Sequence, residues 1–211
     1  YLFFALESIF FQTYKKYKII IIYDNEDKKD LKNIKRFISK KKNIKKFKIK
    51  IIINKKNLGA GESRNIGIRF SKTKYIAFLD SDDLWHKNKL KFQLDYMNKY
   101  QLPISHTSYN IINELGKKIS SRKSKKKLYY KDILNSCDIG LSTVMINLNF
   151  LNKNNFKFPK IKTKEDYVLW LKLSKKGLKF HGMKKIYVKW RKLNNSLSSS
   201  TIRKLIDGYK V

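Results

Sequence analysis

YIAFLDSDDLW (75–85), together with NLGAGESRNIG (57–67) before it, is the part of this 211-residue sequence that decides the fold. The apolar residues 75–79 are typical of a buried strand, and the acidic cluster Asp-Ser-Asp-Asp (80–83) follows them directly. The glycine-containing loop NLGAG leads into residues 61–70, which we predict to be a helix. A helix followed at once by a buried strand indicates the α/β class. Ligands in that class bind beyond the carboxyl ends of the strands, so the acidic cluster is a candidate site.

The sequence on either side repeats this alternation of helix and strand. KIIIIY (18–23) and KIKIII (48–53) are short runs rich in isoleucine, as expected of strands. Apolar residues at helical spacing predict helices over residues 1–12, 31–38 and 90–97. The alternation predicts a parallel sheet with helices on both faces.

The second half of the chain is less regular. Its predicted elements are two strands in residues 105–120 joined at Leu115-Gly116, a strand in 141–147, an amphipathic helix in 164–177 closed by Gly177, and further strands in 179–190. The sequence contains no internal repeat and only two prolines, so nothing marks a domain boundary. We expect one mixed-sheet domain over residues 1–211.

The composition combines a sizeable core with a very high positive charge. Apolar residues make up 42% of the chain, which excludes a disordered basic tail. Lysine and arginine number 50 against 16 acidic residues, a net charge of +34. The lysines are spread along the chain, and no nucleic-acid-binding motif accompanies them. They rise together with Ile and Asn, which indicates the codon bias of an AT-rich genome, with a preference for an anionic membrane surface or substrate as the alternative.

Cysteine content and the two ends of the sequence bear on its surroundings. The single cysteine, Cys137, excludes an internal disulfide and a cysteine-based zinc site. The apolar residues 1–11 include Glu7, are too short to span a bilayer and lack the features of a signal peptide. Tyr1 opens inside a predicted helix and residues 202–211 resemble a helix cut short. We therefore expect a fragment.

Two acidic clusters follow strands that we predict to be parallel. Asp24 lies in YDNED (23–27) directly after one strand, and residues 80–83 follow another. Neighbouring carboxylates repel each other, and a divalent cation with oxygen ligands relieves the repulsion. An ordinary turn in which Asp83 caps the next helix is the alternative. The three histidines share no metal-ligand spacing.

NLGAGESRNIG (57–67) and YIAFLDSDDLW (75–85), at this spacing, closely resemble the inverting glycosyltransferases of family 2, which have the GT-A fold. The resemblance extends over almost the whole chain. Further matching segments are residues 6–22, KEDYVLW (164–170), which is similar to an ED-x-x-LW helix, and VKWRKLNNSLSSS (188–200). The first strand of the family and its following turn are absent, which we interpret as an N-terminal truncation. The resemblance implies a mixed, mostly parallel GT-A sheet flanked by helices.

The resemblance also implies roles in donor binding. Asp24 would accept a hydrogen bond from the imide of the base, which favours uracil or thymine, and Arg64 would lie near the phosphates. Asp80 would contact the ribose or the water shell of the metal, and Asp82 would bind Mn²⁺ or Mg²⁺. Arg191 would hold the diphosphate.

For catalysis, the resemblance implies that Asp166 is the general base, with Glu165 as its alternative or its support. Two acids that stabilise the first turn of a helix are the competing interpretation. Asp83 could cap a helix or belong to the catalytic surroundings. Trp170 could line the acceptor site, although packing in the core is the favoured role.

The implied reaction moves a sugar from a UDP- or dTDP-sugar donor to a saccharide or lipid-linked saccharide acceptor. The resemblance places it in bacterial cell-surface polysaccharide or lipopolysaccharide biosynthesis, on the cytoplasmic side, with peripheral contact to anionic membrane and no specific nucleic-acid partner. A metal-dependent nucleotidyltransferase is the rival enzyme, and it would lack a distant Glu-Asp helix. A non-catalytic basic binding protein is the second rival, and it would leave the acids scattered in space.

Overall fold

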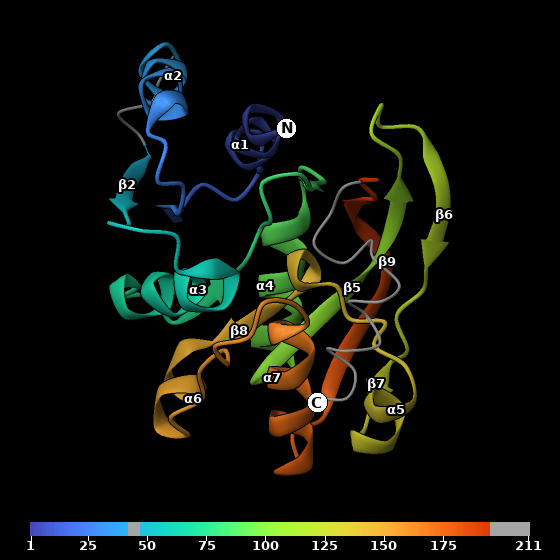
Figure 1. Cartoon of the computed structure of the whole chain (residues 1–211). Helices are drawn as coiled ribbons and strands as arrows, with labels where there is room; N and C mark the ends of the chain where they lie inside the picture. The colour runs from blue at the N-terminus through green and yellow to red at the C-terminus, as the bar shows by residue number, and fades with distance from the viewer. Residues whose placement is uncertain (42–46, 195–211) are drawn as a thin grey trace.

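Strands from both halves of the chain form two sheets that are flanked by helices (Figure 1). The computed structural model describes residues 1–41 and 47–194. The helices are α1 (Leu2–Phe10), α2 (Lys29–Ser39), α3 (Gly59–Phe70), α4 (Lys89–Lys99), α5 (Tyr130–Asn135), α6 (Leu148–Lys153) and α7 (Glu165–Lys175), with a 3₁₀ turn η2 (Leu141–Thr143). The strands are β1 (Lys18–Tyr23), β2 (Lys48–Ile53), β3 (Tyr75–Ala77), β4 (Leu84–Trp85), β5 (Ile104–Ile112), β6 (Lys118–Arg122), β7 (Lys127–Leu128), β8 (Met145–Asn147) and β9 (Phe180–Arg191).

The larger sheet has the strand order β3-β8-β5-β9-β4, with β6 added on β5 and β7 on β9, while β1 and β2 form a separate parallel pair. The α/β class with a mixed sheet is confirmed. The expectation that the sheet is mostly parallel is wrong: in the described part of the chain β1–β2 and β5–β9 are parallel, and the other pairs are antiparallel. A short turn at 113–117 makes β5 and β6 antiparallel neighbours, whereas β5 and β9 are joined by a long crossover that includes α5, α6 and α7.

Most predicted elements are present, with shifted ends. The helix predicted over 61–70 begins at Gly59, and the strand predicted over 75–79 ends at Ala77. Residues 141–147 form η2 and β8 in place of one strand, and 179–190 belong to the single strand β9. The sequence missed β4, β7, α5 and α6, because elements of two to six residues show too little periodicity. The helix predicted over 202–211 lies outside the described residues.

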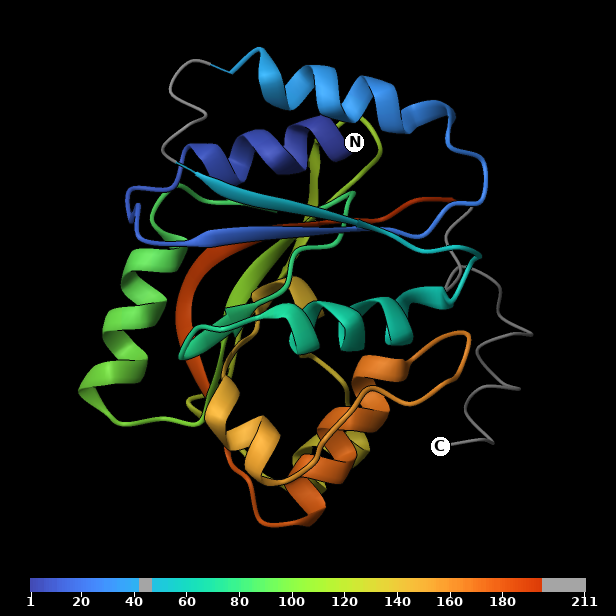
Figure 2. The same ribbon diagram turned by 90° about the vertical axis from the view of Figure 1, so that its left-hand side faces the viewer.

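The pair β1–β2 is packed between helices. Figure 2 shows α1 and α2 on one side of these strands and α3 on the other. Tyr23 of β1 packs with Leu31 and Ile34 of α2 in a small apolar cluster. The buried Gln12, just after α1, donates to the His86 carbonyl (2.9 Å) and accepts from the Leu90 amide (3.0 Å), which joins α1 to the start of α4.

The main core lies beneath α7 and holds that helix in place. Trp170 is fully buried and contacts Phe180 and Phe158 edge-on, with ring centroids 5.5 and 6.2 Å away. Trp170 therefore packs in the core, as favoured, and does not line an acceptor site. Leu169 and Leu173 are also fully buried. Among the described helices, none has the length and apolar character needed to cross a bilayer.

Candidate active site

The acidic turn 80–83 follows β3 and is hydrogen-bonded to η2. The Asp80 amide donates to the hydroxyl of Ser142 (3.1 Å), and the indole N–H of Trp85 donates to the Ser142 carbonyl (2.8 Å). Ser142 is 1% exposed, so both ends of the turn are bound to one buried residue. This role of Ser142 was not predicted, because the residue lies in a segment that we expected to be a strand.

Arg64 joins the acidic turn to the first turn of α7. Its guanidinium donates through Nη2 to Asp80 Oδ1 (2.9 Å) and through Nη1 to Glu165 Oε1. The Arg64 side chain is 16% exposed and that of Glu165 9%. Burial alone would lower the pKa of Arg64, but the carboxylates of Asp80, Glu165 and Asp166 raise it above its ordinary value. Three of the predicted site residues, Asp80, Glu165 and Asp166, therefore lie around a fourth, the largely buried cation of Arg64.

The residues around Arg64 in NLGAGESRNIG explain why the start of α7 lies so close to α3. A Cβ at Gly61 would lie 2.7 Å from the Pro159 carbonyl oxygen and 3.4 Å from Glu165 Cβ, so a side chain at that position would displace the segment that leads into α7. Asn65 accepts from the Phe158 amide (2.9 Å) and donates to the Phe158 carbonyl (3.0 Å). The Gly and Arg-Asn residues of NLGAGESRNIG thus dock the Glu-Asp helix onto α3.

Asp166, the second residue of α7, has a strongly perturbed acidity. Burial raises its pKa to about 6, Arg64 opposes the rise, and Glu165 adds to it. The Tyr167 amide donates to its carboxylate (2.8 Å). A carboxylate with this pKa is mostly ionised at neutral pH yet is a stronger base than an ordinary aspartate, which suits proton abstraction.

Asp82 and Asp83, in the turn after β3, contact Arg191 at the end of β9. Burial and then Asp80 raise the pKa of both, that of Asp83 well above its usual range. Asp83 is 1% exposed and accepts the Arg191 amide through Oδ1 (2.8 Å). Within the described residues its Oδ2 has no hydrogen-bond partner. Asp83 therefore caps no helix and instead ties the acidic turn to β9.

Arg191 is 5% exposed and donates to main-chain carbonyls: through Nε to Asp82 (2.9 Å), and through Nη1 to Asn113 (3.0 Å) and Glu114 (2.9 Å). This placement favours a structural role over the predicted contact with a diphosphate.

Asp24 caps α3. Its carboxylate accepts the amides of Leu58 and Gly59 (both 2.8 Å) and the side-chain amide of Asn54 (2.7 Å). Gly59 is about 7.5 Å along the helix axis from Arg64, at about 1.5 Å per residue. Asp24 therefore lies at the edge of the same group of residues. Asn54 could have been found from the sequence, because it follows a predicted strand directly.

The charge pattern of this region is suited to a divalent cation. The described residues contain no group of three His, Cys, Asp or Glu side chains that could hold a metal by itself. Mg²⁺, however, is commonly bound through one or two carboxylates together with substrate phosphates and water. Burial and then the carboxylate of Asp80 raise the pKa of Asp82, and Arg64 already occupies one oxygen of Asp80. Asp82 is thus the better metal ligand of the two.

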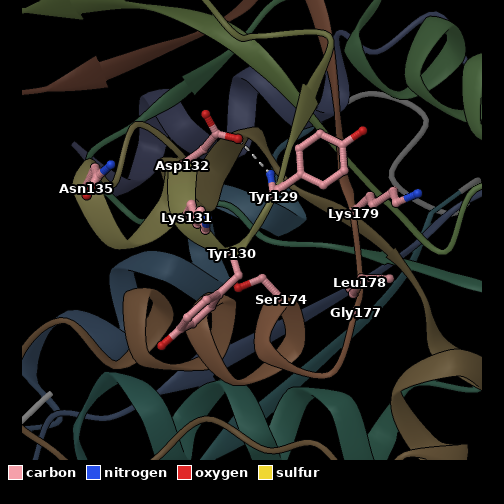
Figure 3. A pocket seen from close by; sticks show the side chains of 9 residues that line it. All are labelled: Tyr129, Tyr130, Lys131, Asp132, Asn135, Ser174, Gly177, Leu178 and Lys179. Carbon is pink, nitrogen blue, oxygen red and sulfur yellow. Dashed lines mark hydrogen bonds between the residues drawn. The ribbon is translucent and has the colours of Figure 1, made fainter.

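A separate pocket of about 650 Å³ lies between α5 and the end of α7 (Figure 3). Tyr129 and Tyr130 line it together with polar residues and Lys179. Its acid, Asp132, is bound to the Tyr129 amide (3.0 Å) and to Lys125 (3.1 Å). None of the predicted site residues lines this pocket.

Comparison with known proteins agrees with the geometry around Arg64. The model of glycosyl transferase family 2 matches residues 1–157. The chain belongs to this family. An uncharacterised glycosyltransferase of Rickettsia felis is 38% identical over 175 residues, which cover 82% of this chain and 28% of that protein. The chain thus spans little more than a quarter of that relative.

Two further members of family 2 or its fold cover more of the chain. The Escherichia coli UDP-Glc:alpha-D-GlcNAc-diphosphoundecaprenol beta-1,3-glucosyltransferase WfgD is 30% identical over 205 residues, 95% of this chain and 76% of that enzyme. The crystal structure of Staphylococcus aureus TarS (residues 1–349) with UDP-GlcNAc has a TM-score of 0.76 at 18% identity, and covers 95% of this chain and 57% of TarS. The latter likeness confirms the GT-A fold. Membership of family 2 argues against the rival nucleotidyltransferase class.

Proposed function

We propose that this chain transfers a sugar from a nucleoside-diphosphate donor to a hydroxyl acceptor, with inversion at the anomeric carbon. The observation that carries the proposal is the bridge made by Arg64, which brings Asp80 of the acidic turn against Glu165 and Asp166 of α7. Residues 80 and 166 are far apart in sequence, so a solvated acidic turn and an unrelated helix start would have no reason to meet. A donor site and a base side by side are what a single displacement requires.

The donor that we propose is a UDP-sugar, with a dTDP-sugar as the alternative. The E. coli relative is named for UDP-Glc, and TarS was crystallised with UDP-GlcNAc. Asp24, at the edge of the group, would accept the imide N–H of uracil or thymine through the remaining capacity of its carboxylate, and Asp80 would face the ribose. Asp82 would hold Mn²⁺ or Mg²⁺, which when bound supplies positive charge to the diphosphate.

In the proposed step Asp166 removes the proton from the acceptor hydroxyl as its oxygen attacks the anomeric carbon. The bond from that carbon to the diphosphate oxygen breaks, and the nucleoside diphosphate leaves with the bonding electron pair. One bond to the carbon forms and one breaks on opposite sides, so the configuration inverts and no covalent sugar–enzyme intermediate arises. Glu165 cannot easily take the proton, because Arg64 holds its carboxylate.

The acceptor that we propose is a saccharide, free or lipid-linked, in bacterial cell-surface polysaccharide or lipopolysaccharide synthesis. The name of the E. coli relative specifies a diphosphoundecaprenol-linked sugar. Such an acceptor lies at the membrane, and the excess of lysine would favour peripheral contact with anionic lipid on the cytoplasmic side. No nucleic-acid partner is part of this proposal.

The experiment compares Asp166→Asn with Glu165→Gln, by measuring sugar transfer and UDP affinity in each. Asn is nearly isosteric with Asp but cannot accept the proton, so Asp166→Asn should lower the transfer rate by about 10²–10⁴-fold with unchanged UDP affinity. Glu165→Gln should cost less in rate. A dead Glu165→Gln beside a fully active Asp166→Asn would make Glu165 the base. Full activity in both variants would overturn the proposed mechanism.

A further inference from the structure

Arg191 is the last residue of β9 and the point where three segments of the chain meet. Its main-chain amide donates a hydrogen bond to the Asp83 side chain, and its Nε donates one to the Asp82 carbonyl (2.9 Å). Its Nη1 holds the turn between β5 and β6 through the carbonyls of Asn113 and Glu114. The ring of Tyr1 lies over the guanidinium, 4.6 Å from its Cζ.

These contacts leave Arg191 poorly placed to touch a substrate. Both hydrogens of Nη1 and the one on Nε are used by carbonyl oxygens of the protein. With 5% of the residue exposed, reaching outward to a diphosphate would break several of these bonds and leave buried carbonyls unpaired. Arg64, by contrast, bonds to side-chain carboxylates.

We propose that Arg191 is a positioning residue, which fixes the backbone of Asp82 and Asp83 and so sets the direction of the Asp82 carboxylate. The inference rests on the proposed function, in which Asp82 holds the metal. Two consecutive residues of the turn are held, Asp82 by its carbonyl and Asp83 by its side chain. Both anchors follow the Asp82 Cα along the chain and hold the peptide group that joins Asp82 to Asp83, which restricts rotation of the Asp82 backbone and with it the direction of the Cα–Cβ bond.

The electrostatics explain why such an anchor is needed. Asp80, Asp82 and Asp83 place three acidic side chains within four residues, and like charges at this spacing repel each other. The guanidinium of Arg191 lies against this turn through its bond to the Asp82 carbonyl, and its positive charge reduces that repulsion. The guanidinium is itself fixed by its bonds to the turn between β5 and β6. The Lys192 amide, next along the chain, donates to the carbonyl of Ile112 at the end of β5 (2.9 Å), so the anchor is rigid.

The test uses Arg191→Met and Arg191→Lys in the full chain, with UDP as the probe in Mn²⁺ and in EDTA. Loss of a residue that orients a metal ligand typically costs about 10–100-fold in metal affinity or activity. Arg191→Met should lose that much UDP affinity in Mn²⁺ and almost none in EDTA. Arg191→Lys should lose nearly as much, because an ammonium cannot reproduce the fork that reaches two segments at once. Arg69→Met, which removes an exposed arginine bound to Glu62, is the charge control and should change neither value.

Amide hydrogen exchange of residues 80–85 gives a second readout that does not depend on metal. Arg191→Met should speed exchange in this turn, whereas Leu151→Ala, a cavity in the buried side of α6, should destabilise the protein without a selective effect there. Equal loss of UDP affinity with and without Mn²⁺, or full affinity in Arg191→Lys, would show that Arg191 contacts the nucleotide. If the parent binds UDP equally in Mn²⁺ and EDTA, the proposed metal site fails, and unchanged exchange in Arg191→Met would separately overturn the positioning role.

Discussion

Replacing Arg64 with Met removes the cation that bonds to both Asp80 and Glu165. Methionine keeps much of the apolar length of the side chain, so the change removes the charge and its two hydrogen bonds with little loss of packing volume. The Glu165 side chain is 9% exposed, and it lies beside Asp166, whose ionised form burial already disfavours. The variant therefore leaves the two neighbouring carboxyl groups at the start of α7 without the cation of Arg64.

The expected cost follows from the burial of each partner. Breaking a buried ion pair by removing one member costs about 3–5 kcal/mol, whereas an exposed pair contributes about 0–1 kcal/mol. The bond to Glu165 belongs to the first class, and the bond to the 36% exposed side chain of Asp80 is nearer the second. Arg64→Met should therefore lower the free energy of unfolding by about 3–5 kcal/mol in total. For a chain of this size, about 2–4 °C per kcal/mol gives a fall in Tm of roughly 6–20 °C.

The loss of folding stability in Arg64→Met should depend on pH. Without Arg64, which opposes the rise, the folded-state pKa of Asp166 should lie further above its ordinary value. Between the unfolded-state pKa and the folded-state pKa of Asp166, the folded state then binds more protons than the unfolded state. The free energy of unfolding therefore falls as pH increases through this range. The loss should be largest near about pH 8 and smaller near about pH 5.

Unfolding in urea, followed by circular dichroism at both pH values, measures this difference. Arg69→Met is the matched control, because Arg69 lies on the same helix, is 55% exposed in its side chain and pairs with Glu62; its cost should stay below about 1 kcal/mol. Equal costs for the two variants, or a cost for Arg64→Met that is the same at both pH values, would refute the view that Arg64 compensates buried carboxylates.

Three other results are expected. Asp82→Ala should abolish Mn²⁺-dependent binding of UDP in a titration without lowering Tm, because it relieves the repulsion from Asp80; unchanged affinity would exclude the metal role. The transfer rate should fall about tenfold per pH unit below about pH 6 and level off above it, since Asp166 must be ionised; a flat profile across that range would contradict its role as base. Binding to anionic vesicles should be weak and should decrease with salt, while a tight, sequence-selective DNA or RNA complex at physiological salt would revive a nucleic-acid function.

The sequence predicted the members of the candidate site better than their contacts. Asp80 and Asp82 could be found because acids directly after a buried strand are visible in a single sequence, whereas Asp166 was identified only through the resemblance of KEDYVLW to the ED-x-x-LW helix of the family. The bonds of Arg191 could not, because Asn113 and Glu114 meet it only after β5 and β9 pair in parallel across a long crossover. The capping of α3 by Asp24 was also hidden, since it depends on where the loop before α3 passes β1.

Strand direction was the weakest part of the fold prediction. β3 and β8 have three residues each, and a run of this length shows burial but not the direction of its neighbour. The long strand β9 was predicted as several strands because Gly182 interrupts its apolar pattern. A Cβ at Gly182 would lie 2.1 Å from the Lys125 carbonyl oxygen, so the glycine marks a close approach of the backbone and not a break.

The isolation of the β1–β2 pair has a consequence for handling the protein (Figure 2). Each of these strands has one side paired and one side whose backbone groups pair with no other strand in the described part of the chain. Ile20, Ile21 and Ile22 are only partly buried, so an apolar, β-branched edge is available to add a strand from another molecule. Mutual repulsion between chains of charge +34 opposes such assembly, and salt screens that repulsion. Concentrated solutions should therefore aggregate as ionic strength rises, the reverse of the salting-in of an ordinary globular protein.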